Sequence, residues 1–131
     1  MRWTIAAAAL ALAGAAQAGE EDRGRQVYME ACATCHGEAG RGDGPMAELL
    51  TLPVPDLTGL AARNGGEFPW LWLVQLIGEG GGLRGHGGPM PVFGPILGGE
   101  AAVADAPDGT PVIAPEPILA VVDHLRRLQA P

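Results

Sequence analysis

Both cysteines of the chain, Cys32 and Cys35, stand in the segment ACATCHG, and His36 follows the second one directly. Two thiols separated by two residues serve three chemistries in proteins: a redox-active disulfide, half of a zinc site, or thioether attachment of haem. A disulfide across so short a loop removes little entropy from the unfolded chain and would stabilise the fold only weakly. The pair therefore indicates a reactive or ligand-binding role rather than a structural disulfide.

Three helices are predicted to position these side chains, and they cover residues 20–37, 67–80 and 114–131. The first begins with acidic residues, which suit a helix N-terminus, and it runs into the cysteines. The other two carry apolar residues at helical spacing. A further helical turn is expected at 46–50, and Pro107, Asp108 and Gly109 have the chemistry of a turn.

The segments 37–45 and 80–100 are dense in glycine and proline, which predicts long loops. No strand pattern is visible. We therefore predict an all-α domain, with a few helices and long loops wrapped around a bound group. With 21 glycines and 12 prolines in 131 residues, the apolar core is thin for this length, and a buried haem would supply the missing apolar bulk.

The three chemistries make different demands on the chain. A thioredoxin-like site needs a strand before the cysteines, and none is predicted. A structural zinc site needs four ligands, whereas His86 and His124 lie far from His36 in the sequence. Haem attachment needs only the residues present, because each thiol adds to one vinyl group and the adjacent imidazole binds the iron. The sequence therefore favours a covalently attached haem with iron, bound through Cys32, Cys35 and His36.

The second axial ligand of the iron has several candidates. Met90 lies between two prolines, where a rigid extended segment could hold its sulfur against the iron. Met46 reads more simply as a packing residue, and Met29 is too close to the attachment segment to reach the opposite face. His86 stays open as an alternative that would lower the reduction potential. We favour Met90.

Residues 24–128 resemble a class I cytochrome c, in particular the small exported mono-haem cytochromes of bacterial respiratory chains. The resemblance is carried by Gly24 and Tyr28 ahead of CATCHG, and by the segments GRGDGPM, FPWLWLVQLIGEG, HGGPMPVFG and LAVVDHLRRLQ. It implies that Gly24 and Tyr28 pack against the C-terminal helix. It also implies that the Pro45 carbonyl accepts a hydrogen bond from Nδ1 of His36, which would fix the imidazole ring.

One position departs from the family pattern. His124 stands where such proteins usually carry an aromatic residue, so the contact between the terminal helices is expected to be looser, and we interpret His124 as a packing or surface residue. The candidate haem contacts are Tyr28, Trp70, Trp72 and Arg84.

The first residues have the features of a secretory signal peptide: Arg2, a short apolar run and the small-residue pattern Ala16-Gln17-Ala18. We expect residues 1–18 to be removed and residues 19–131 to form the cytochrome c domain in the periplasm. The formal net charge is −7, and loss of Arg2 makes it one unit more negative. This charge argues against nucleic acid as a partner and favours redox proteins with a basic docking face. No stable membrane insertion is expected after cleavage.

The sequence thus predicts an electron carrier rather than an enzyme, with one haem c held by His36 and Met90 and single electrons passing between redox partners. Two alternatives stay open. One is a haem subunit of a larger dehydrogenase or oxidase complex, and the other is a haem protein that binds a small ligand.

Overall fold

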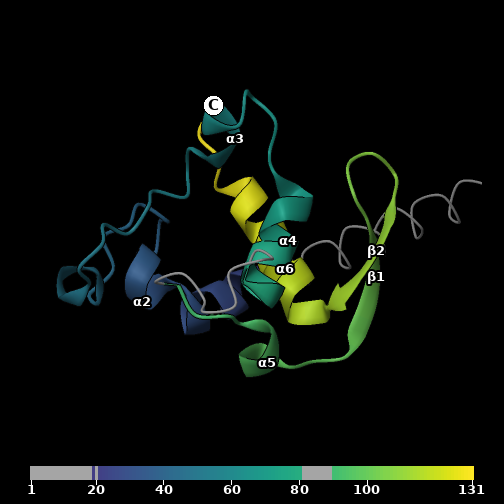
Figure 1. The fold of residues 1–131 in the computed structure, drawn as a ribbon, viewed down its shortest axis with the longest axis horizontal. Helices are drawn as coiled ribbons and strands as arrows, with labels where there is room; N and C mark the ends of the chain where they lie inside the picture. Colours follow the sequence, from purple (N-terminus) through teal and green to yellow (C-terminus); the bar gives the residue numbers. More distant parts are fainter. Residues whose placement is uncertain (1–18, 20, 81–89) are drawn as a thin grey trace, which may run out of the picture.

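The computed structural model describes residues 19, 21–80 and 90–131. The predicted signal peptide, Arg84 and His86 lie outside these residues. The described elements are helical residues 21–31, α2 (Ala33–His36), the 3₁₀ helix η1 (Ala47–Leu49), α3 (Leu60–Arg63), α4 (Trp70–Glu79), α5 (Gly94–Leu97), β1 (Ala101–Asp105), β2 (Pro111–Pro115) and α6 (Glu116–Arg127) (Figure 1). None of the helices in these ranges is long and apolar enough to cross a membrane.

The three predicted helices and the helical turn at η1 are confirmed, but the all-α prediction is wrong in one part. Strands β1 and β2 form an antiparallel hairpin in which Val103 pairs with Ile113. The turn between them contains the predicted Pro107-Asp108-Gly109 group, and the backbone N–H of Thr110 donates to the Asp108 carboxylate. Alanine occupies both inward positions of β1, so the exposed and half-buried residues of this strand differ little in hydrophobicity.

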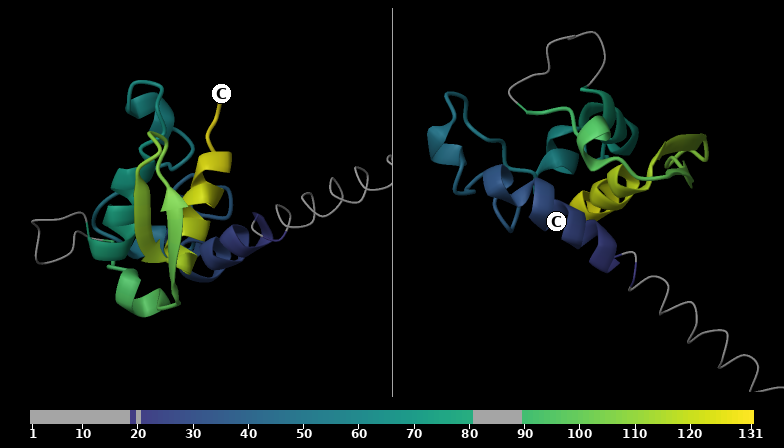
Figure 2. Two further views of the ribbon diagram at one scale, coloured as in Figure 1. Left: turned by 90° about the vertical axis from the view of Figure 1, so that its right-hand side faces the viewer. Right: turned by 90° about the horizontal axis from the view of Figure 1, so that it is seen from below.

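The core lies between α4, α6 and the N-terminal helix. The most deeply buried side chains of α6 are Ile118, Val121 and Val122, and α4 contributes Trp70, Leu73, Val74 and Ile77. Figure 2 shows α4 and α6 side by side in two further views, with the hairpin against them. The indole N–H of Trp70 donates to the carboxylate of Asp123 at 3.3 Å, which joins α4 to α6.

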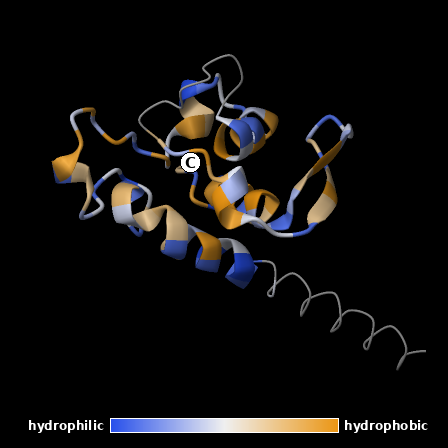
Figure 3. Cartoon of the chain, turned by 60° about the horizontal axis from the view of Figure 1, so that its bottom comes forward, coloured by the Kyte–Doolittle hydropathy of each residue, from blue (hydrophilic) through white to orange (hydrophobic). Residues whose placement is uncertain are grey.

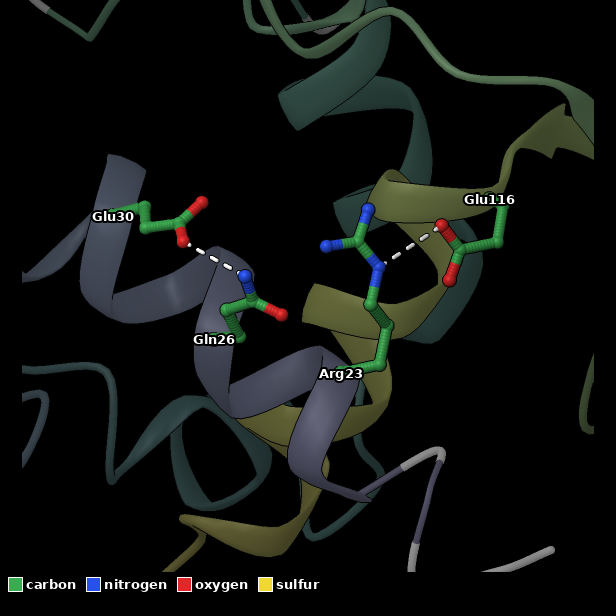
Figure 4. Close-up of polar contacts among 4 residues, drawn as sticks. All are labelled: Arg23, Gln26, Glu30 and Glu116. Carbon is green, nitrogen blue, oxygen red and sulfur yellow. Dashed lines mark hydrogen bonds and ion pairs between the residues drawn. The ribbon is translucent and has the colours of Figure 1, made fainter.

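The N-terminal helix crosses α6 at very close range. A Cβ atom at Gly24 would overlap the carbonyl oxygen of Ala120, so only glycine allows the two backbones to approach this far. Beside the crossing, Nε of Arg23 lies 3.3 Å from the Glu116 carboxylate (Figure 4). The contact between Gly24 and the C-terminal helix, which the family resemblance implies, is therefore present.

Candidate functional site

The two thiols and the imidazole lie on one side of a continuous helical path. The backbone N–H of Cys32 donates to the Tyr28 carbonyl, and that of His36 donates to the Cys32 carbonyl at 2.9 Å. Residues 32, 35 and 36 are therefore spaced as i, i+3 and i+4, which places their side chains on the same face. Both cysteines are free thiols, with Cys32 buried and Cys35 half-buried.

The loop after α2 folds back onto this helical turn and holds it. The N–H of Met46 donates to the Thr34 carbonyl at 2.9 Å, and the N–H of Gly44 donates to the Cys35 carbonyl at 3.1 Å. A Cβ atom at Gly44 would overlap the carbonyl oxygens of Ala33 and Thr34, so this close return requires glycine. The glycine-rich composition that predicted a loop here thus also positions the thiol segment.

The imidazole of His36 is buried, and its Nδ1 atom lies 3.4 Å from the carbonyl oxygen of Pro55. The sequence-based expectation of Pro45 as this acceptor is corrected: the chain returns to His36 ten residues later, in the proline-rich segment before α3. A carbonyl only accepts hydrogen bonds, so the neutral ring carries its proton on Nδ1 and leaves the Nε2 lone pair free. Burial lowers the pKa of His36, while the Pro55 hydrogen bond opposes that shift.

A second support runs from the thiol segment to α6. The hydroxyl group of Tyr28, which is fully buried, donates a 2.6 Å hydrogen bond to the Gly37 carbonyl. The Tyr28 ring also packs against His124, with ring centroids 5.1 Å apart and planes tilted by 46°. His124 is only 8% exposed, so of the two roles predicted for it, packing or surface residue, the structure shows the packing role.

A cavity of about 280 Å³ opens beside the thiols. It is lined by Ala31, Cys32, Cys35, His36, Leu50, Leu52, Pro53, Val54, Pro55, Leu76, Gly80, Met90, Pro91 and Phe93. Met90 reaches it because the Phe93 N–H donates to the Ile77 carbonyl at 2.8 Å, which ties the segment that follows Met90 to α4. The structure thus brings Met90 to the same cavity as Cys32, Cys35 and His36, although more than fifty residues separate them.

The chemistry of this lining distinguishes between the three uses of the cysteine pair. Burial, with a smaller contribution from the neighbouring Cys35, raises the pKa of Cys32 to about 12. A redox-active pair instead needs a thiol whose pKa is lowered. Within the described ranges, no group of three or more His, Cys, Asp or Glu side chains could hold a metal ion, so no described ligand set suits zinc.

The same lining fits a haem. Two thiols, a neutral imidazole and a thioether share one cavity, and its other lining side chains are aliphatic, proline or phenylalanine. Apolar walls suit the faces of a porphyrin, and imidazole and thioether are both axial ligands of haem iron. The raised pKa of Cys32 does not conflict with a haem site, because a thioether bond removes the titrating proton.

Several sequence-predicted contacts lie away from the cavity. Tyr28 and Trp70 are buried in the core, where Gly37 and Asp123 accept their hydrogen bonds, and neither lines the cavity. Trp72 is 51% exposed and lies beside Pro69 at a separate surface depression. Arg84 and His86 lie outside the described residues, so the structure does not compare His86 with Met90.

The other two methionines among the described residues, Met29 and Met46, do not line the cavity, and this favours Met90. Met46 is 40% exposed, and Met29 packs against the core. Sequence reasoning missed the apolar wall formed by Leu50, Leu52 and Val54. The alternation of apolar residues and prolines in TLPVPD was the available signal, because it describes an apolar segment too rigid to join a helix.

The chain matches a known protein family. The family model described as "Cytochrome c" matches residues 21–104, which include all the lining residues of the cavity. Searches among curated proteins and among solved structures found no match.

Proposed function

Because the chain belongs to the cytochrome c family as a class I cytochrome c, we propose that it is a periplasmic electron carrier. Its axial ligands in this proposal are a histidine and a methionine. Members of this family bind haem c covalently and transfer electrons. The haem supplies a single iron that alternates between the ferric and ferrous states.

One observation carries the ligand assignment: Cys32, Cys35, His36 and Met90 line the same cavity. In the proposal Cys32 and Cys35 would hold the haem through thioether bonds, and Nε2 of His36 and the sulfur of Met90 would bind its iron. The Pro55 carbonyl orients the His36 ring, since Nδ1 donates to it. The apolar wall of Leu50, Leu52 and Val54 excludes water, and a thioether ligand in an apolar site favours the ferrous state.

An iron held by both His36 and Met90 would have no site left for a substrate. The protein therefore acts by passing electrons rather than by catalysing a reaction, and its partners are redox proteins that approach the cavity side. Because the chain is acidic overall, partners with a basic surface associate with it fastest at low ionic strength.

An absorption spectrum of the oxidised holoprotein tests the ligand pair. A weak far-red band from iron–sulfur coordination is expected in the wild type and is expected to disappear in Met90→Ala. Met46→Ala is the matched control, because Met46 does not line the cavity, and its band should persist. If the wild type lacks the band, or if Met90→Ala retains it, Met90 is not the ligand and a second histidine becomes the leading hypothesis.

The export part of the proposal rests on the signal-peptide pattern of residues 1–18. Intact-mass measurement of the protein from the periplasmic fraction tests it. Cleavage before Gly19 predicts a chain that begins at Gly19 and carries one covalent haem. A full-length chain in the cytoplasmic fraction would contradict the location without affecting the assignment of the haem ligands.

A further inference from the structure

The outer face of the β1–β2 hairpin exposes an apolar pair. Val103 and Ile113 are direct cross-strand partners, and their side chains are 68% and 73% exposed. On the same face Ala101 pairs with Pro115, and Asp105 pairs with Pro111. Scattered exposed apolar residues are normal on protein surfaces, but these residues adjoin one another on one sheet face. The hairpin therefore presents a small contiguous apolar surface.

Carboxylates border this apolar surface. Glu100, Asp105 and Asp108 are exposed, and residues 98–115 contain no arginine, lysine or histidine. Neither of the ion pairs found among the described residues involves these three carboxylates. Figure 3 shows the apolar colouring along the strands and the polar colouring at the turn. The surface thus combines an apolar centre with an acidic border.

The hairpin lies away from the haem cavity. Figure 1 places α2 and the hairpin on opposite sides of α4 and α6, and Figure 2 agrees. The inward faces of β1 and β2 pack against α6, which fixes the orientation of the outer face. A protein bound to the hairpin would leave the thiol segment and Met90 accessible from the other side.

We propose that the outer face of the hairpin, centred on Val103 and Ile113, docks a protein partner whose apolar surface is bordered by arginine or lysine. Desolvation of the apolar pair supplies the affinity, and the acidic border selects a basic partner and sets its orientation. The proposal concerns a surface separate from the cavity and does not depend on which residue is the second axial ligand.

Charge and strand chemistry favour this partner over a second copy of the chain. A symmetric dimer through this face would bring together two acidic borders that contain no basic residue, and like charges repel. Pro111 and Pro115 also remove two N–H donors from β2, which opposes strand addition at its edge. With a second copy and strand addition both disfavoured, the partner is recognised through the side chains on the outer face of the hairpin.

A photo-crosslinking amino acid placed at position 113 of the full chain, expressed and exported in its own cell, identifies the partner. The matched control places it at position 49, because Leu49 is also 73% exposed but lies in η1. We expect a crosslink to one protein at position 113 and not at position 49, in a segment where basic residues flank apolar ones. A crosslink to a second copy, to lipid, or equally from both positions would overturn the proposal.

Binding of the purified holoprotein to that crosslinked partner gives the quantitative test. The double variant Val103→Thr with Ile113→Thr keeps β-branched side chains and should bind about tenfold more weakly, whereas Leu49→Thr should bind as the wild type does. Asp105→Asn with Asp108→Asn should slow association and reduce its salt dependence. Unchanged affinity in the threonine double variant, with an unchanged haem spectrum as evidence of folding, would refute the proposal.

Discussion

The rings of Tyr28 and His124 pack together with their centroids 5.1 Å apart, while the Tyr28 hydroxyl group donates to the Gly37 carbonyl at 2.6 Å. One aromatic side chain therefore contacts both α6 and the residue directly after His36. Because the imidazole must hold a fixed position, this link makes the packing of the terminal helices part of the support of the haem site.

Replacing Tyr28 with phenylalanine keeps the packing with His124 but removes the hydrogen bond. The Gly37 carbonyl would then keep only the Gly40 N–H as a donor, so we expect the free energy of unfolding to fall by about 0.5–1.5 kcal/mol. Denaturant titration of the two holoproteins measures this difference. A loss below a few tenths of a kcal/mol would show that water replaces the donor and that the link is not important for stability.

The same hydroxyl group predicts a loss of stability at alkaline pH. Burial is the largest cause that raises the pKa of Tyr28, to about 12 in the chain with free thiols, followed by the charges of Cys32 and Asp43. With Cys32 in a thioether bond its charge is absent, but burial and Asp43 still raise the pKa of Tyr28. A pKa raised above its unfolded value of about 10 means that the stabilisation is complete below pH 10 and is lost as the pH rises through 12. The chain has one tyrosine and no lysine, and attached thiols do not titrate.

Between pH 9 and 12 the unfolding free energy should therefore fall in the wild type and stay nearly level in Tyr28→Phe. The unfolded and folded pKa values of Tyr28 set this pH interval. Equal slopes in the two proteins would show that another group causes the alkaline loss.

His124 predicts the opposite dependence at acid pH. Burial lowers the pKa of His124, and the guanidinium groups of Arg127 and Arg25 lower it further. Since the folded state then binds fewer protons than the unfolded chain, the stabilisation is complete above a pH of about 6.5 and is lost as the pH falls through the folded pKa. His124→Phe should keep the ring contact with Tyr28 and remove this part of the acid loss.

Comparing the unfolding free energies of wild type and His124→Phe across the acid range isolates the histidine, because both proteins share the same carboxylates. The difference between them should widen in favour of the variant as the pH falls. A constant difference would indicate that His124 titrates at its ordinary pKa.

The sequence was most informative where spacing determines geometry. The positions of Cys32, Cys35 and His36 predict three side chains on one helical face, which the structure contains. The extended segment predicted from the prolines around Met90 stays a prediction, because Pro89 lies outside the described residues. The choice between Pro45 and Pro55 depends on where a long loop returns, and local composition does not encode that return. The hairpin was missed because alanines along β1 give almost no difference in hydrophobicity between its faces.

The close backbone approach between the N-terminal helix and α6 provides the last prediction. A Cβ atom at Gly24 would overlap the Ala120 carbonyl oxygen and press against Cβ of His124, so Gly24→Ala should lower the unfolding free energy by about 1–3 kcal/mol. Gly78→Ala is the matched control, since that helical glycine has only a side-chain atom of Ile118 nearby, at 3.9 Å. Alanine is the better helix former there, so the control should gain up to about 1 kcal/mol. Denaturant titration decides the matter: if both variants gain stability, the terminal helices can separate without cost and Gly24 is not required for their packing.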